Sequence, residues 1–203
     1  MQRIQMSNIH PINKTLLLFV LGITVFTFAA RFFPHLPNFT PIGAFALFTG
    51  VYLAPKTKWA LCLPLLILLL SDLFIGFYEI QIMALVYGSF LVYGALGLWI
   101  SQKKNPVAIV AGTFGGALIF FLITNFGVWA FSSLYEQSFA GLMNAYVLAI
   151  PFFRPTLLGD LFYTGLFFGA YEVILRYEGS RIFSLKSFQK VALLKSVTHD
   201  HRS

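Results

Sequence analysis

Charged residues are scarce in this chain of 203 residues: only 10% are Asp, Glu, Lys or Arg, whereas 58% are hydrophobic. A soluble domain carries roughly a quarter charged residues. The composition therefore excludes an ordinary soluble protein and indicates an integral membrane protein. No long polar segment remains to form a second domain, so we expect one all-α, multi-pass domain in the cell (inner) membrane.

Cysteine is nearly absent as well. The single residue, Cys62, lies in an apolar run, where it excludes a disulfide framework within one chain and any Cys-based zinc site. The four histidines include no pair with ligand spacing inside an apolar segment, and the HDH sequence at 199–201 favours a polar tail. We therefore expect no metal and no cofactor. For His35, between two prolines, loop packing is favoured over a ligand role.

Catalytic motifs are missing too. HExxH, GxSxG, Walker A and CxxC do not occur. LLGD at 157–160 offers one half of the motif pair of intramembrane aspartyl proteases, but SD at 71–72 does not offer the other half. The sequence therefore predicts no enzyme. Without an ATP-binding motif, active movement of a solute needs energy from a partner or an ion gradient.

What the chain does contain is apolar segments. A spanning helix needs about 20 residues, with a range of about 17–25, and five of the six segments meet that, whereas 41–54 is short enough to be re-entrant. A further segment, 138–152, is expected as a helix on the outer face, and 178–203 as a basic cytoplasmic tail, either amphipathic on the inner membrane face or partly disordered. The six predicted membrane helices are 14–30, 41–54, 59–77, 81–101, 106–131 and 155–176.

The net charge of +7 is distributed in a way that indicates topology. If all six segments span, twelve of the fourteen Lys and Arg lie on one side, and only Arg31 and Arg154 lie on the other. Basic residues collect on the cytoplasmic side of a membrane. We therefore expect a six-transmembrane-helix bundle with both termini cytoplasmic and no nucleic-acid partner. The first segment is favoured as a retained helix over a cleaved signal peptide.

Polar residues of the predicted bundle gather in its outer half. A charge inside the hydrocarbon normally faces a bundle interior or a wet cavity, and Thr156, Asp160 and Tyr163 share one helical face. These observations predict a polar pocket open to the outside, rimmed by aromatic residues that suit a flat, ring-containing ligand or form an interfacial belt. The predicted substrate-binding residues are Arg31, Asp72, Asn125, Trp129, Arg154, Thr156, Asp160 and Tyr163.

Each of these residues also has a plainer interpretation. Asp160 or Asp72 can tie two helices through Arg31 or Arg154, and Asn125 is expected to form an interhelical hydrogen bond. Small residues in two segments favour ordinary close packing of helices. They are Gly88, Gly94, Ala95 and Gly97 in 81–101 and Gly112, Gly115, Gly116 and Ala117 in 106–131. A Glu172–Arg176 pair near the inner interface is expected to be structural.

Four stretches resemble an uncharacterised family of membrane transport proteins described as S-component-like. They are HLPNFTPIGAFALFTG (35–50), PLLILLLSDLFIGFY (64–78), FLITNFGVW (121–129) and AGLMNAYVLAIPFFRPTLLGDLFYTGLFFG (140–169). Six helices, about 200 residues, both ends inside and a lidded outward pocket resemble the substrate-binding S components of energy-coupling factor (ECF) transporters. The resemblance covers residues 15–176.

This resemblance implies uptake of a vitamin-like micronutrient. Such a protein captures the solute outside, associates with an ECF-type transmembrane coupling subunit and two ATPases, and topples to release the solute inside. The first apolar segment, TLLLFVLGITVFTFAA, lacks the AxxxA pattern with which S components often dock the coupling subunit. Whether the protein acts alone or with another partner therefore stays open. A non-transport scaffold or assembly protein and a self-sufficient channel or carrier remain as alternatives. A cavity of a few hundred Å³ within the helix bundle favours a solute-binding protein, whereas a filled, dry bundle core favours a scaffold.

Overall fold

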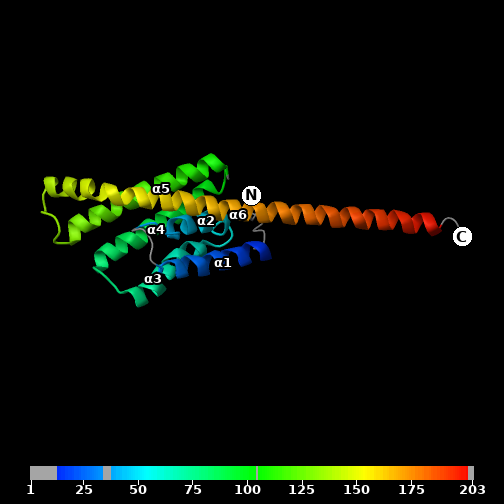
Figure 1. Ribbon diagram of the computed structural model, residues 1–203, viewed down its shortest axis with the longest axis horizontal. Coiled ribbons are helices and arrows are strands. Elements are labelled where there is room, and N and C mark those ends of the chain that lie inside the picture. The colour runs from blue at the N-terminus through cyan, green and yellow to red at the C-terminus, as the bar shows by residue number, and fades with distance from the viewer. Residues whose placement is uncertain (1–12, 34–37, 104, 201–203) are drawn as a thin grey trace, which may run out of the picture. The chain divides into compact units, whose positions relative to one another are not determined.

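The computed structural model describes the backbone of residues 13–33, 38–103 and 105–200, and side chains as far as Ser180. Within these residues the chain is helical and has no strand, which confirms the all-α prediction. The predictions made for His35 and for the side chains of the HDH sequence concern residues outside this description. The elements are α1 (Lys14–Ala30), α2 (Ile42–Tyr52), the 3-10 helix η1 (Lys58–Cys62), α3 (Leu63–Ile75), α4 (Ile80–Ile100), α5 (Pro106–Phe131) and α6 (Phe139–Asp200) (Figure 1).

Four helical segments are long and apolar enough to cross a membrane. They are Lys58–Ile75, Ile80–Ile100, Pro106–Phe131 and Phe139–Ser180. In hydrocarbon every backbone polar group must be satisfied internally, which a helix does within one segment. The chain is therefore a membrane protein. Two shorter apolar helices, α1 and α2, accompany these four.

Local sequence explains where several helices begin and end. Asn13 accepts a hydrogen bond from Leu16 N at 2.9 Å at the start of α1, and Asn105 accepts one from Ala108 N at 2.7 Å at the start of α5. Such caps satisfy one of the free N–H groups at a helix start. Pro106 occupies the first position of α5, where its missing N–H costs nothing. Gly76 ends α3 with a φ of 114°, a conformation that favours glycine.

The shortest α-helix lies deepest. Every residue of α2 from Ile42 to Val51 is buried. At 1.5 Å per residue its 11 residues span only about 16 Å, roughly half of a hydrocarbon core. Contacts with α1, α3, α4 and α5 enclose it. It is a helix inside the bundle, which explains why it needs no lipid-facing length.

Glycines allow α2 and α4 to approach closely. A Cβ on Gly50 would lie 2.2 Å from the carbonyl oxygen of Gly94, and a Cβ on Gly97 would lie 2.4 Å from that of Leu47. Gly112 and Gly116 of α5 are packed in the same way, against the side chains of Ile100 and Tyr93. The packing role predicted for small residues is confirmed at Gly97, Gly112 and Gly116, whereas a Cβ on Gly88 or Gly115 would meet nothing within 4 Å.

Helices α4, α5 and the first part of α6 alternate in direction. Leu85 of α4 lies against Gly127, and Ile100 lies against Gly112, so α4 and α5 are antiparallel. The Thr113 hydroxyl lies 3.2 Å from that of Thr164, while the Phe121 and Phe153 rings are 5.1 Å apart, so α5 and α6 are antiparallel too. Figure 1 shows the two ribbons of α5 and α6 side by side.

A single helix, α6, stands where the sequence predicted two. The expected outer-face helix at 138–152 and membrane helix at 155–176 form one helical element that contains Pro151 and Pro155. Each proline lacks the N–H that would bond to the carbonyl four residues earlier. Because the two prolines are four residues apart, the carbonyl without a partner at Pro155 is that of Pro151. The Thr156 hydroxyl donates to the next carbonyl, Phe152 O, at 2.8 Å. Membrane helices tolerate prolines when such side-chain donors are at hand.

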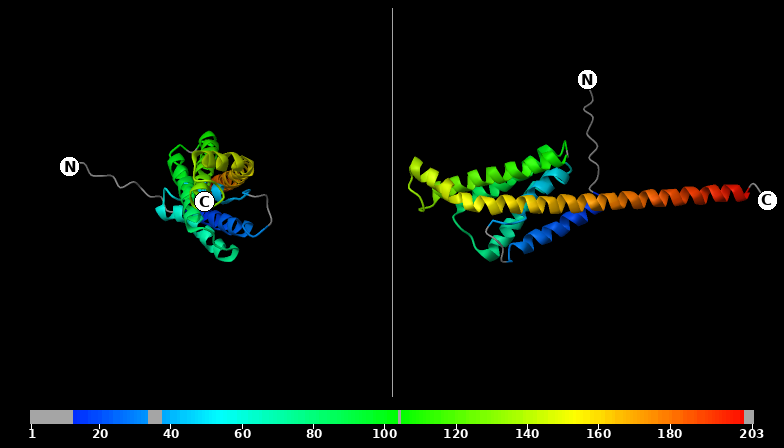
Figure 2. Two further views of the ribbon diagram at one scale, coloured as in Figure 1. Left: turned by 90° about the vertical axis from the view of Figure 1, so that its left-hand side faces the viewer. Right: turned by 45° about the horizontal axis from the view of Figure 1, so that its top comes forward.

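The chain forms two compact units, Met1–Phe167 and Phe168–Ser203. In the second, the helix continues without interruption to Asp200, as the orange to red ribbon of Figure 2 shows. Glu172 and Arg176 form the expected pair at 3.3 Å, and both side chains are exposed. The Ser180 hydroxyl donates to Arg176 O at 2.9 Å. The candidate site lies entirely in the first unit.

Candidate functional site

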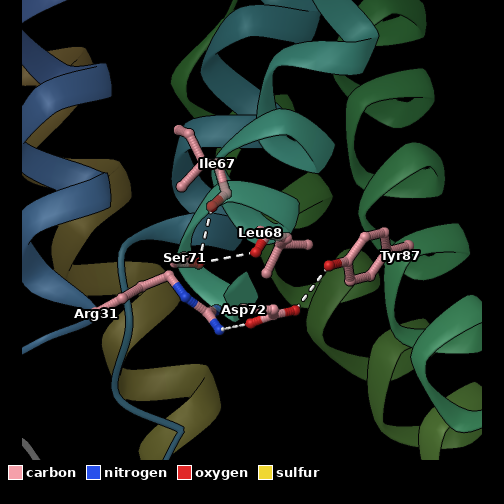
Figure 3. Close-up of polar contacts among 6 residues, drawn as sticks. All are labelled: Arg31, Ile67, Leu68, Ser71, Asp72 and Tyr87. Carbon is pink, nitrogen blue, oxygen red and sulfur yellow. Dashed lines mark hydrogen bonds and ion pairs between the residues drawn. The ribbon is translucent and has the colours of Figure 1, made fainter. Parts of the chain in front are cut away.

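An ion pair joins the end of α1 to the end of α3. Arg31 Nη2 lies 2.6 Å from Asp72 Oδ1, and the Asp72 side chain is only 3% exposed. The Tyr87 hydroxyl of α4 donates to the other oxygen, Asp72 Oδ2, at 2.7 Å (Figure 3). Both carboxylate oxygens of Asp72 are thus satisfied. The neighbouring Ser71 hydroxyl does not join this network, because it donates to carbonyls of its own helix.

A second acid, Asp160 of α6, has a different environment. Its side chain is buried, and the Tyr93 hydroxyl of α4 donates to its Oδ2. Among the residues that the structure describes, no Lys, Arg or His forms an ion pair with it. Its other oxygen, Oδ1, lies against the start of α2, since a Cβ on Gly43 would be 2.4 Å from that atom. Asp160 therefore links three helices through a hydrogen bond and close packing.

Asp72 and Asp160 both line one cavity, which has a volume of about 230 Å³. The Arg31–Asp72 pair lines one part of its wall and the Asp160–Tyr93 pair another. The guanidinium of Arg31 retains a buried donor, Nε, that has no partner among the described residues. The full lining is Arg31, Asn38, Thr40, Ile42, Gly43, Leu68, Asp72, Tyr78, Val86, Phe90, Tyr93, Phe120, Thr156 and Asp160.

A second cavity of about 270 Å³ adjoins the first. The two share five lining residues, so their walls are continuous. The rest of the second cavity is mostly aromatic and aliphatic, with Thr124 and Asn125 as its remaining polar residues. Together the two cavities form one site with a charged lobe and an apolar lobe. The shared residues are Asn38, Tyr78, Val86, Phe120 and Thr156.

Tyr78 lies in the connection between α3 and α4 and lines both lobes. Partial burial, with the negative charge of Asp72 as the next contribution, raises the pKa of its hydroxyl to about 12, against a smaller opposing effect of Arg31. The hydroxyl is therefore protonated at neutral pH. It supplies a neutral hydrogen-bond donor at the junction of the lobes.

Five of the eight residues predicted from the sequence line this site. Arg31, Asp72, Thr156 and Asp160 face the charged lobe, and Asn125 faces the apolar lobe. The prediction of an interhelical hydrogen bond for Asn125 was wrong, because its Nδ2 donates to Phe121 O of its own helix at 2.8 Å. That bond uses one of the two amide N–H donors within α5, and the side chain lies at the cavity wall.

The other three predicted residues lie elsewhere. Tyr163 packs among aromatic rings, 5.5 Å from Phe39 and 6.0 Å from Phe26 between ring centroids. Arg154 is exposed and pairs with neither acid among the described residues. Trp129 donates from Nε1 to Glu136 O at 3.0 Å. None of the three lines either lobe.

Sequence reasoning missed the tyrosines and one glycine of the site. Tyr87 and Tyr93 read as ordinary apolar residues of 81–101, although a buried tyrosine hydroxyl needs a partner, and each donates to one of the two acids. Gly43 carried no signal at all, since its role arises only from the approach of α6 to α2. The tyrosine hydroxyls were a detectable signal, because between Gln81 and Trp99 the segment has no other polar side chain but Ser89.

Replacement of Gly43 by alanine tests the contact behind Asp160. The new Cβ would lie 2.4 Å from Asp160 Oδ1, and the short, buried side chain has little room to move. Overpacking of this kind costs about 1–3 kcal/mol, so we expect Gly43→Ala to lower the melting temperature of the purified protein. Gly22→Ala is the matched control, because nothing lies within 4 Å of its Cβ. Equal melting temperatures of the two variants would contradict the contact.

Fold and site together define a helical membrane protein with two adjoining cavities, one of them lined by charged residues. The chain belongs to a family of unknown function, DUF6580, whose model matches residues 11–183. No curated protein matches the chain. No solved structure matches it either. The resemblance to S components therefore depends on the sequence motifs and the expected topology alone.

Proposed function

We propose that this protein is a membrane transport protein that captures a small, vitamin-like solute in the two-lobed site. The observation that supports this most directly is a cavity of about 230 Å³ with two acids and one arginine in its wall. Binding pockets are mostly apolar with a few convergent polar groups, and they measure about 300–1,000 Å³. The two adjoining lobes together reach that range and have that composition.

The proposal includes six membrane crossings with both termini cytoplasmic. The alternation of α4, α5 and α6 fits it, as does the meeting of the ends of α1 and α3 at the Arg31–Asp72 pair. In this arrangement α2 crosses inside the bundle, its short length completed by flanking segments. The site then opens to the outer side, where Arg31 and Arg154 are the basic residues.

Energy for release of the solute comes from a partner in this proposal. The sequence has no ATP-binding motif. By resemblance to S components the partner is an ECF-type coupling subunit with ATPases. The missing AxxxA pattern on α1 means that docking would use other residues.

A scaffold or assembly role is the second candidate. The Arg31–Asp72–Tyr87 network joins α1, α3 and α4 through hydrogen bonds that need no ligand. In a scaffold these contacts only tie helices together. The cavities would then be incidental, and filling them would leave the protein unchanged or more stable.

Filling the cavity separates the two candidates. Val86 lines both lobes and takes no part in the polar contacts, so Val86→Phe should block a ligand while the ion pair remains. We expect a vitamin from a screened panel to raise the melting temperature of the parent protein and to have no effect on that of Val86→Phe. At 100 times its Kd, a bound ligand stabilises the folded protein by about 2.7 kcal/mol. The control is Val25→Phe, an exposed valine of α1.

The unliganded melting temperatures complete this test. A parent protein that responds to no solute, with Val86→Phe at least as stable as the parent, would favour the scaffold. An equal response of the parent and of Val86→Phe would place the ligand outside these cavities.

A further inference from the structure

The charged lobe contains one acid that no described cation balances. Its ionisable acids and bases are Arg31, Asp72 and Asp160. Arg31 and Asp72 neutralise each other at 2.6 Å. Asp160 receives a hydrogen bond from Tyr93 but has no cationic partner among the residues that the structure describes.

A buried carboxylate needs more than one hydrogen bond. Removing an ionised group from water is costly unless an opposite charge accompanies it, and charges inside membranes are paired or face a wet cavity. The Tyr93 hydroxyl orients Asp160 without neutralising it. One side of the carboxylate is closed by Gly43, and the carboxylate borders the cavity. The space beside Asp160 is therefore suited to a positively charged group of a ligand.

The walls favour an organic cation over a metal ion. Rings of Phe90, Tyr93 and Phe120 stand around the charged lobe, and aromatic faces attract ammonium groups. Hard divalent ions take about six oxygen ligands. Among the described residues no group of three His, Cys, Asp or Glu could hold a metal.

The second lobe accommodates an apolar body. It is lined by Phe121, Phe152 and Phe153 together with aliphatic residues, and the Phe121 and Phe153 rings are 5.1 Å apart. Thr124 and Asn125 add hydrogen-bonding capacity at its wall. Phe120 lines both lobes, so a ring that lies against it would place an attached group in the charged lobe.

We propose that the solute is an organic monocation whose protonated or quaternary nitrogen pairs with Asp160 and whose ring or apolar body occupies the lobe lined by Phe121, Phe152 and Phe153. This inference rests on the proposed function, because it names the chemistry of a solute for the same site. It predicts discrimination by charge among molecules of similar shape.

Matched probes test the charge. Tryptamine, tryptophol and indole-3-propionate present one ring with a cationic, a neutral and an anionic chain, and benzyltrimethylammonium adds a quaternary cation. Equilibrium binding to the purified protein is measured by calorimetry, for the parent, Asp160→Asn and Glu136→Gln. Asp160→Asn keeps the shape and a hydrogen-bond acceptor and removes the charge. Glu136→Gln removes an equal charge at an exposed residue that lines neither lobe.

We expect tryptamine to bind at least about tenfold more tightly than tryptophol, since hydrogen bonds to charged groups are the stronger ones, and the anion to bind weakest. Benzyltrimethylammonium has no N–H to donate, so its binding reports the attraction of its charge to Asp160 and to the aromatic rings. Asp160→Asn should lose that preference and bind tryptamine no more tightly than tryptophol, and Glu136→Gln should behave as the parent. Tighter binding of the neutral or anionic probe, or equal cation binding by Asp160→Asn, would overturn the inference and leave a solute-binding protein. Binding of none of the probes, together with no response to the vitamin panel, would overturn the proposed function as well.

Discussion

Arg31→Gln is expected to lower the free energy of unfolding by about 3 kcal/mol, because it leaves the Asp72 carboxylate buried without its cation. Breaking a buried pair by removing one partner typically costs 3–5 kcal/mol. The lower end applies here, since the Arg31 side chain is 19% exposed and the Tyr87 hydroxyl continues to donate to Asp72. The measurement is the unfolding equilibrium of the purified protein in mixed micelles, compared with the parent.

The double variant Arg31→Met, Asp72→Leu is the informative control. Replacing both members of a buried pair by apolar residues is often neutral, so most of the lost stability should return. If the single and double variants were equally unstable, the loss would come from packing of the long arginine side chain. A single variant as stable as the parent would show that the pair contributes nothing to folding.

Gly50→Ala is expected to reduce stability by about 3 kcal/mol or more and to lower the yield of monodisperse protein. The added Cβ would lie 2.2 Å from Gly94 O, which is backbone, so no side-chain rotation relieves the clash. Overpacking a core typically costs about 1–3 kcal/mol and sometimes more. Here α2 must shift away from α4, against which it packs along its length.

Gly88→Ala is the matched control for this variant. Gly88 belongs to α4, the helix against which Gly50 of α2 packs, but a Cβ on Gly88 would meet nothing within 4 Å. Alanine favours a helix over glycine, so Gly88→Ala should be neutral or slightly stabilising. A mild effect of Gly50→Ala, similar to that of Gly88→Ala, would contradict the close α2–α4 contact.

Several elements followed directly from local sequence. The α5 bounds agree with the predicted 106–131 because Asn105 caps the helix and Pro106 begins it. Arg31, Asp72 and Asp160 were found because a charge in an apolar segment is costly and therefore marks an interior site. In α6 the sequence predicted an outer-face helix at 138–152 and a separate membrane helix at 155–176, whereas one helix continues through Pro151 and Pro155.

The misplaced residues have a common cause. Tyr163, Arg154 and Trp129 lie near Asp160 or Asn125 in sequence, but segments that are apolar on every side do not reveal which face points inward. In the structure Tyr163 turns toward Phe26 of α1 and Phe39, and Arg154 is exposed. Helical spacing predicts which residues share a face, whereas the packing of neighbouring helices determines what that face contacts.

By itself the sequence determined that the chain is a helical membrane protein, because the bilayer requires long apolar segments with internally satisfied backbones. It also determined which side chains are too polar to face lipid. Only the tertiary structure decided their partners: Arg31 meets Asp72 across 41 residues, and Tyr93 meets Asp160 across 67. Such pairs depend on how α2, buried on all sides, brings the other helices together. That packing leaves Asp160 beside a cavity with no cationic partner in the described part of the chain, a feature that no local pattern of residues discloses.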